Sequence, residues 1–258
     1  MGHAGKSEQL KTTDPLYPLR HSAAHVMAQA VRRLYPEAKL AIGPPIEDGF
    51  YYDLDLPVKL TDADLPRIEA EMHKIIHENH PFTHSHMSKA EATAHFTQRG
   101  ERFKLDIIQR IPDAQISLYT DGEFVDVCEG PHVKSTGEIK AVKLLSVAGA
   151  YWRGNERGPQ LQRIYGTVFP NQAYLEAYLT RLEEAKRRDH RKLGTALELF
   201  SFEELAGPGV VFYHPKGALV RSLIEERTNA CRSPMILAIS ASIFGKSSSV
   251  SFAERSRS

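Results

Sequence analysis

Apolar and polar residues alternate with helical or strand spacing along most of the chain. Over residues 18–35 the apolar side chains recur every three to four positions, which predicts a helix that Pro36 ends. Residues 50–56 alternate between apolar and polar after an Asp-Gly turn. This pattern predicts a strand that pairs in a hairpin with residues 39–45.

A second amphipathic helix is predicted over residues 65–76. Thr61 or Asp62 precedes it as a candidate N-cap, because Thr and Asp side chains accept hydrogen bonds from the first free amides of a helix. His73 and His77 are four residues apart on the polar face of this helix. We interpret these two histidines as solvated surface residues rather than as a metal site.

The remaining patterns alternate short helices with strands. A strand is predicted over 81–86, followed by helices over 89–98 and 101–110 and by strands over 116–119, 124–128, 142–147 and 161–169. Strands joined by tight turns pair antiparallel. We therefore predict an α+β fold with a mainly antiparallel sheet packed against helices.

Composition and turn residues divide the chain into five predicted segments. They are a flexible leader over 1–14, a main domain over 15–170, a linker helix over 171–194, a further short piece with a helix over 195–230, and a Ser-rich tail over 231–258 that we expect to be disordered. Asn171 is the expected cap of the linker helix, which should end in the basic run 186–192. This run could contact phosphates, but we interpret it as a solvated helix face, the commoner role of such charges.

The overall composition narrows the class of protein. With 258 residues, 41% of them hydrophobic, the chain can bury a substantial core. A formal net charge of +1 gives no global signal for a polyanion partner, so any nucleic-acid surface must come from local basic clusters. Two cysteines in unlike contexts indicate a reducing compartment, and no apolar run is long enough to span a bilayer. A cytoplasmic location without a membrane partner is the default expectation.

Candidate chemistry lies in two short motifs that are far apart in the sequence. His21 and His25 are four residues apart in a helical run, so their imidazoles share one helix face. Cys128 and His132 are four residues apart around Gly-Pro, which indicates a loop after a strand. Three imidazoles and a thiol could meet at one point, where they would bind zinc or activate a water molecule. Spacing alone does not select this set, because the chain has 12 histidines.

Several longer stretches carry a resemblance to a known family. They are RHSAAHVMAQAV at 20–31, LAIGPPIEDGFYYD at 40–53, DVCEGPHV at 126–133, GAYWRGNE at 149–156 and LQRIYGTVF at 161–169. Together they resemble the editing domain of threonyl-tRNA synthetases. LEEAKRRDHRKLG at 182–194 and VVFYHPKGA at 210–218 resemble the linker helix and the start of the class II catalytic domain of that family. Alanyl-tRNA synthetase editing domains share the His-His and Cys-His pairs, but the other stretches are similar to the threonyl enzymes.

The sequence departs from the family's pattern towards both ends. Bacterial members generally begin with a small ubiquitin-like domain, and their catalytic core carries two motifs with ATP-binding arginines. We find no match to these parts, and the residues after about Ala230 do not resemble the family. We therefore expect no ligation of threonine from this chain alone.

The resemblance implies hydrolysis of serine that has been wrongly esterified to threonine tRNA. Serine lacks one methyl group of threonine, a difference that supplies only about 10–200-fold discrimination, so a second, hydrolytic site is needed. By resemblance His21, Lys104 and Asp126 are the catalytic residues. His21 would contact the water or the ribose hydroxyl, and Lys104 would position a second water or stabilise the oxyanion. The implied substrate-binding residues are His25, Tyr52, Cys128 and His132.

The resemblance leaves two ways of using these side chains. The four residues His21, His25, Cys128 and His132 are zinc ligands by type, and the related alanyl editing proteins use such a set for zinc. In the threonyl branch the same residues are expected to hold water directly. We favour a reaction that requires no cofactor, with zinc as the alternative. The expected partner is threonine tRNA mischarged with serine, and a homodimer or an association with a synthetase is a further expectation.

Two other functions remain open from the sequence. The chain could be an inactive synthetase fragment that binds tRNA, or that binds a synthetase partner through residues 195–230. It could also be a structural zinc protein, which a chelator would unfold. Without the resemblance, Lys104 reads as a surface helix lysine, and Tyr52 on its hairpin serves packing equally well.

Overall fold

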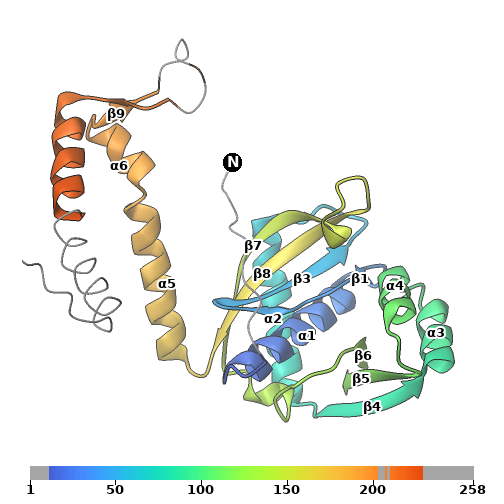
Figure 1. The fold of residues 1–258 in the computed structure, drawn as a ribbon. Helices are drawn as coiled ribbons and strands as arrows, with labels where there is room; N and C mark the ends of the chain where they lie inside the picture. Colours follow the sequence, from blue (N-terminus) through green and yellow to red (C-terminus); the bar gives the residue numbers. More distant parts are fainter. Residues whose placement is uncertain (1–11, 203–206, 208–209, 229–258) are drawn as a thin grey trace, which may run out of the picture. The chain divides into compact units, whose positions relative to one another are not determined.

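The computed structural model describes residues 12–202, 207 and 210–228 (Figure 1). The chain divides into two compact units, the first reaching Thr180 and the second beginning at Arg181. The predicted tail and most of the predicted leader lie outside the described residues. Among the residues that are described, none of the helices combines the length and apolar character needed to cross a membrane.

The first unit contains two antiparallel sheets. The larger has the order β1 (Lys39–Leu40), β3 (Gly49–Asp55), β8 (Gln160–Phe169) and β7 (Ala141–Tyr151), and β2 (Pro45–Ile46) also pairs with β3. The smaller has the order β4 (Phe82–Ser88), β5 (Gln115–Asp121) and β6 (Phe124–Val127). The predicted α+β fold with mainly antiparallel pairing is therefore confirmed.

Helix α1 (Tyr17–Leu34) lies between the two sheets, as Figure 1 shows. Its central residues from Ser22 to Val31 are buried on every side, packing against β3, β8 and the second helix, and against Phe124 of the smaller sheet. A helix enclosed in this way needs small and apolar side chains all round. Ser22, His25 and Gln29 are polar exceptions within this buried stretch. Buried polar groups need partners, so these positions are candidates for a functional role.

Helix α2 (Leu65–Glu78) packs its apolar side against α1 and β7. A short 3₁₀ turn, η1 (Asp62–Asp64), precedes it, and Thr61 N and Oγ1 both donate to Asp64 Oδ2. The exposed positions of α2 include His73 and His77. Their interpretation as surface residues is confirmed.

Helices α3 (Lys89–Gln98) and α4 (Arg102–Arg110) cover the smaller sheet. Ser88 caps α3 by accepting a hydrogen bond from Glu91 N. A second apolar core joins these helices to β5 through Ala92, Phe96, Ile108, Ile116 and Leu118. This packing fixes the face of α4 that carries Lys104, which is only 3% exposed.

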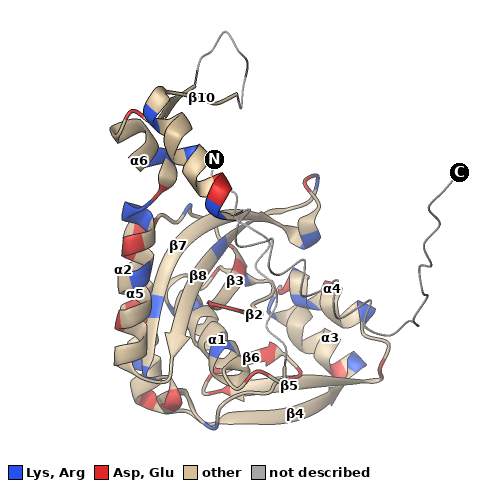
Figure 2. Cartoon of the chain, turned by 60° about the vertical axis from the view of Figure 1, so that its left-hand side comes forward, with Lys and Arg blue, Asp and Glu red and all other residues tan. Residues whose placement is uncertain are grey.

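The helical segment after the sheet differs from its prediction. Asn171 accepts from Tyr174 N at the start of α5 (Gln172–Arg187), as expected. The helix then ends at Arg187, and a separate helix α6 (His190–Ala196) begins, because Asp189 accepts from Arg191 N and caps a new helix. Figure 2 shows basic and acidic positions interleaved along the ribbon of α5, the pattern of a solvated helix.

The second unit is small in its described part. Strands β9 (Phe200–Ser201) and β10 (Phe212–Tyr213) pair antiparallel, and residues 215–228 are helical. The helix predicted over 217–226 lies within this segment. The boundaries predicted for the domains remain predictions.

Candidate functional site

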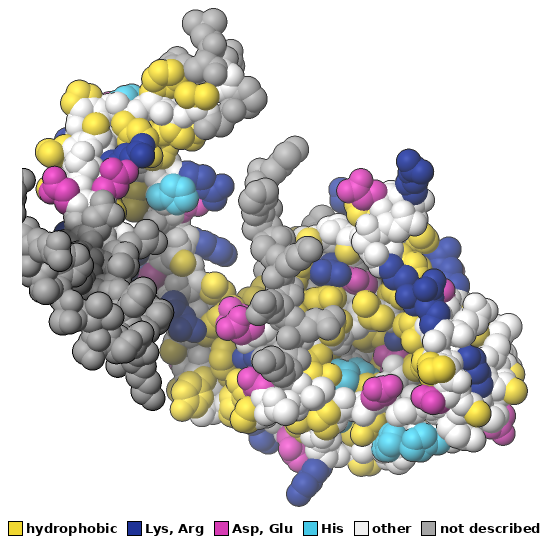
Figure 3. Space-filling view, viewed as in Figure 1, with side chains coloured by type: hydrophobic (Ala, Val, Ile, Leu, Met, Phe, Trp, Pro, Cys, Tyr) yellow, Lys and Arg dark blue, Asp and Glu magenta, His cyan; other side chains and the backbone are white. Residues whose placement is uncertain are grey.

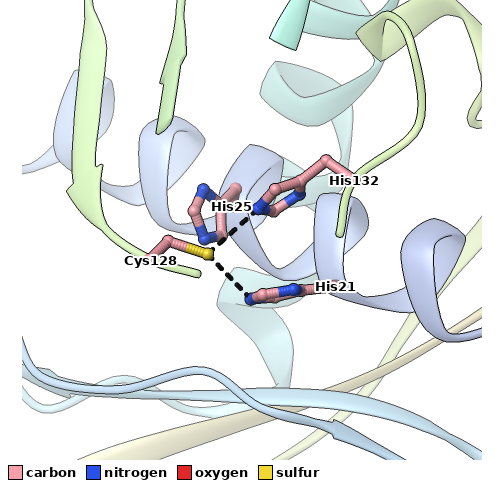
Figure 4. Close-up of side chains that lie close together, drawn as sticks. All are labelled: His21, His25, Cys128 and His132. Carbon is pink, nitrogen blue, oxygen red and sulfur yellow. Dashed lines mark hydrogen bonds between the residues drawn. The ribbon is translucent and has the colours of Figure 1, made fainter. Parts of the chain in front are cut away.

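The structure brings together the four side chains of the two sequence motifs (Figure 4). His21 and His25 come from α1, while Cys128 and His132 come from the loop that follows β6. Cys128 Sγ lies 3.3 Å from His21 Nε2 and 3.1 Å from His132 Nε2. The His25 ring completes the group, with its centroid 5.2 Å from that of His21 and 4.4 Å from that of His132.

The shape of the loop depends on Gly130. Its φ of +69° lies in the left-handed region, which side chains with a Cβ rarely adopt. A Cβ at this position would also lie 2.5 Å from the hydroxyl of Tyr119. With no side chain in the way, Gly130 N approaches Cys128 Sγ to 3.3 Å and donates to it. The glycine thus lets the loop fold back over its own thiol.

Aromatic rings hold His132 from two sides. Phe82 of β4 stacks on it with an interplanar angle of 4° and a centroid distance of 4.8 Å. Tyr119 of β5 packs at 4.5 Å. On the helix side, Ser22 Oγ lies 2.9 Å from His132 Nδ1. The ring therefore has one orientation set by both the sheet and α1.

A second set of buried groups adjoins the histidines. Lys104 Nζ lies 2.5 Å from Asp126 Oδ1 and donates to the Tyr52 hydroxyl at 2.9 Å. The Tyr52 hydroxyl in turn donates to Asp126 Oδ2 at 2.6 Å. His25 Nε2 lies 3.9 Å from the same carboxylate oxygen. The interpretation of Lys104 as a surface lysine is therefore wrong, because α4 turns this residue towards Asp126.

Burial sets the protonation states of these side chains. It is the largest cause that lowers the pKa of His21, to about 4, and it also lowers the pKa values of His25 and His132. Burial likewise raises the pKa of the Cys128 thiol to about 12. At neutral pH the cluster consequently holds three neutral imidazoles and a protonated thiol. Burial and the nearby Asp126 raise the pKa of Tyr52, which remains a phenol that can donate.

A cavity of about 370 Å³ opens over this cluster. Six of the predicted site residues line it: His21, His25, Tyr52, Lys104, Asp126 and Cys128. His132 is the seventh and lies beside Cys128 rather than on the cavity wall. Figure 3 shows histidine side chains reaching this face of the first unit among apolar side chains. The predicted residues therefore share one solvent-connected site.

The donor set fits a zinc ion in type and number. One ligand atom from each of His21, His25, Cys128 and His132 lies within 4.8 Å of the others, and His₃Cys is an acceptable zinc set. The raised pKa of the thiol means that zinc would have to displace its proton. A second cluster of possible metal ligands in the described part of the chain consists of Glu78, His80 and Glu123. The Arg33 guanidinium donates to both of these glutamates and therefore already supplies the positive charge that balances them.

Sequence reasoning missed several residues that shape the site. Tyr17 lines the cavity, and Phe82 and Ser22 hold His132. Ser22 gave no separate signal in the sequence, because its neighbours in residues 20–25 include Arg20, His21 and His25. Phe82 comes from a strand that is distant in sequence, and its position depends on how β4 pairs with β5.

Comparisons with known proteins give the site a family context. Residues 116–165 match the threonyl and alanyl tRNA synthetase second additional domain. A threonine–tRNA ligase of Oleidesulfovibrio alaskensis is 55% identical over 224 residues, which are 84% of this chain and 35% of that protein. Those of Desulforamulus reducens and Lawsonia intracellularis are 57% and 54% identical over 80% and 84% of this chain, and 32% and 34% of their own lengths. The chain is a relative of the threonine–tRNA ligases.

The match to the second additional domain covers three of the seven predicted site residues. The matched second additional domain includes Asp126, Cys128 and His132, and the longer alignments cover most of the chain. The resemblance stated from the sequence motifs is confirmed. The chain spans about a third of the length of the curated relatives it matches.

Proposed function

We propose that the first unit hydrolyses the ester between a wrongly attached serine and the terminal ribose of threonine tRNA. One observation carries this proposal. Three members of the His-Cys cluster and the whole Lys104–Asp126–Tyr52 set line the same open cavity, in a chain related to threonine–tRNA ligases. An ester hydrolase needs an oriented water and a stabilised oxyanion, and the two sets can supply one each.

Water is the nucleophile in this proposal. The Cys128 thiol is a poor nucleophile, because a pKa of about 12 leaves very little thiolate at neutral pH. His21 is neutral at this pH and can accept a hydrogen bond from water. The water oxygen attacks the ester carbonyl carbon, the bond to the ribose oxygen breaks, and the proton lost by the water is returned to that oxygen. The products are free serine and uncharged tRNA.

Lys104 supplies positive charge where the oxyanion develops. Its ammonium is held by Asp126 and Tyr52 before the substrate arrives, so little reorganisation is needed. Asp126 is the group that holds it, and Tyr52 both accepts from Lys104 and donates to Asp126. His25 and Cys128 form part of the wall that receives the substrate, and His132 lies beside Cys128.

The favoured mechanism needs no cofactor, and zinc is the alternative. His21, His25, Cys128 and His132 would hold the ion, which when bound would polarise the carbonyl or lower the pKa of a water molecule. In that case Cys128 would act as a thiolate ligand. Lys104 and Asp126 would keep the roles described above.

Deacylation of seryl- and threonyl-tRNA by the purified chain, with and without a chelator, tests the proposal. We expect release of serine but not of threonine, unchanged by the chelator. Loss of serine release in the chelator would establish the zinc alternative. No hydrolysis of either substrate would defeat the proposal, and binding of tRNA without turnover would then identify an inactive synthetase fragment.

A further inference from the structure

Ser22 occupies a central place between α1 and the site loop. It lies next to His21 on the helix and is 0% exposed. Its Oγ accepts a hydrogen bond from Val133 N at 3.1 Å and lies 2.9 Å from His132 Nδ1. One buried hydroxyl thus contacts both the backbone of the loop and the ring of a site histidine.

The direction of these hydrogen bonds follows from the number of protons. The backbone N–H of Val133 can only donate, so Ser22 Oγ uses a lone pair to accept from it. Oγ has a second lone pair that could accept from His132 Nδ1–H, but among the described residues the buried hydroxyl proton would then have no partner, so we assign this proton to the hydrogen bond with His132 Nδ1. A neutral imidazole that accepts at Nδ1 carries its own proton at Nε2. Ser22 therefore favours the Nε2–H tautomer of His132.

The tautomer of His132 also determines which hydrogen bonds Cys128 makes. The Nε2–H group of His132 points at Cys128 Sγ over 3.1 Å, and Gly130 N donates to the same sulfur. With two donors directed at the sulfur, the thiol proton is directed at His21 Nε2, which lies 3.3 Å away. His21 Nε2 is thereby kept as an acceptor. Its single lone pair faces the thiol, and because a thiol is a weak donor a water molecule that enters the cavity can take the thiol's place there.

We propose that Ser22 is a positioning residue that holds His132 in its Nε2–H tautomer and so keeps His21 Nε2 available to accept a hydrogen bond from the attacking water. Ser22 does not touch the substrate and acts through His132 and Cys128. The catalytic consequence rests on the proposed function, whereas the tautomer of His132 can be measured independently of any activity.

A purely structural role for Ser22 is the competing explanation, because its hydroxyl also ties α1 to Val133. Thr136 offers a matched control for that role. It is also 0% exposed, and its hydroxyl likewise accepts from one backbone amide, His80 N, while it donates to Ile75 O. Thr136→Val removes a buried hydroxyl with the same number of partners, away from the histidine cluster.

The first test is nitrogen-15 NMR of the histidine rings in the purified chain at neutral pH. The His132 signals are assigned by their loss in His132→Asn. We expect the Nε2–H tautomer in the wild type and in Thr136→Val, and a shift towards the Nδ1–H tautomer in Ser22→Ala. An Nδ1–H tautomer in the wild type, which a metal ion on Nε2 would also impose, overturns the proposal whether or not the chain is active.

The second test compares deacylation of seryl-tRNA with thermal stability in the same variants. Ser22→Ala should lower kcat at least tenfold with little change in KM, while Thr136→Val should stay within twofold of the wild type at a similar loss of Tm. Ser22→Thr, which keeps the hydroxyl, should recover part of the activity. Equal loss of kcat in Ser22→Ala and Thr136→Val would reduce Ser22 to a structural role. A wild type that does not deacylate defeats the proposed function and leaves the NMR result as the test of the tautomer.

Discussion

Lys104 Nζ lies 2.5 Å from Asp126 Oδ1, and the two side chains are only 4% and 3% exposed. Removing both charges from water is costly, and the cost is offset only where further hydrogen bonds satisfy the pair. Here Tyr52 bonds to both partners, and Val127 N donates to Asp126 Oδ1. A pair held in this way beside an open cavity presents a fixed positive charge to any molecule that enters.

Lys104→Met should therefore destabilise the protein and abolish deacylation. Removing one partner leaves the Asp126 carboxylate buried and unpaired, which typically costs about 3–5 kcal/mol. The control is Lys143→Met, because Lys143 pairs with Glu69 at 2.9 Å but is 43% exposed, and such pairs contribute about 0–1 kcal/mol. Urea unfolding measures both costs. A similar small loss in both variants would contradict the buried-pair argument.

His21→Ala should remove most of the seryl-tRNA deacylation. Positioned acid–base and water-orienting groups typically contribute about 10²–10⁴-fold in rate, and we expect a loss in this range. His73→Ala provides the control, since His73 is a histidine on the exposed face of α2. Rates are measured under single-turnover conditions with both proteins folded. If the two substitutions reduced the rate equally, His21 would have no special role.

The helix that carries His21 was predictable because its signals are local. Pro18 and Pro36 mark its ends in the sequence, and the structure places α1 at Tyr17–Leu34. The spacing of His21 and His25 then fixes their common face, as in any helix. Cys128 and His132 were recognisable because Gly-Pro between them forces a loop.

The roles of Lys104 and Ser22 could not be predicted from the residues next to them in the sequence. The sequence around Lys104 is that of an ordinary amphipathic helix, and its burial depends on Asp126 and Tyr52, which belong to other strands. Ser22 precedes two alanines and looks like an ordinary small helix residue. Its role depends on its contact with His132, in a loop 110 residues further along the chain. The end of α5 was missed for a local reason, because Asp189 within the basic run caps a new helix.

Asp121 should make the free energy of unfolding depend on pH. It is 0% exposed, and within the described part of the chain neither of its carboxylate oxygens has a hydrogen-bond partner. Burial, followed by the charges of Asp126 and Glu123, raises its pKa from 3.8 to about 8. Between these two values the unfolded chain releases the proton while the folded chain retains it. The contribution of Asp121 to stability is thus full below about pH 4 and is lost as the pH rises through about 8.

Asp121→Asn should remove this dependence. We expect the stability of the variant relative to the wild type to rise by roughly 1–3 kcal/mol between pH 5 and pH 8, the usual cost of a buried unpaired polar group. Asp113→Asn, at an exposed position, makes the same change in net charge and should show no such rise. Urea unfolding across this range gives the differences. A flat difference for Asp121→Asn would mean that its carboxyl group has a partner in solution.

Gly130→Ala tests whether the backbone of the site loop controls the chemistry. Gly130 and Gly154 have nearly the same positive φ, +69° and +71°, so alanine strains the backbone equally at both. They differ in their surroundings. An added Cβ would meet the Tyr119 hydroxyl at 2.5 Å in the first case and nothing within 4 Å in the second.

Gly154→Ala should therefore lower the free energy of unfolding by about 1–2 kcal/mol, the cost of the left-handed backbone conformation alone. Gly130→Ala should cost more, and it should also slow seryl-tRNA deacylation, because relief of the clash must move the loop and break the bond from Gly130 N to Cys128 Sγ. Thermal unfolding and single-turnover rates on both variants separate the two effects. Equal stability losses with unchanged rates would show that the loop accepts the added methyl group without displacing Cys128 or His132. Slower deacylation in Gly130→Ala alone would link the geometry of this turn to the order of hydrogen bonds that runs from Ser22 to His21.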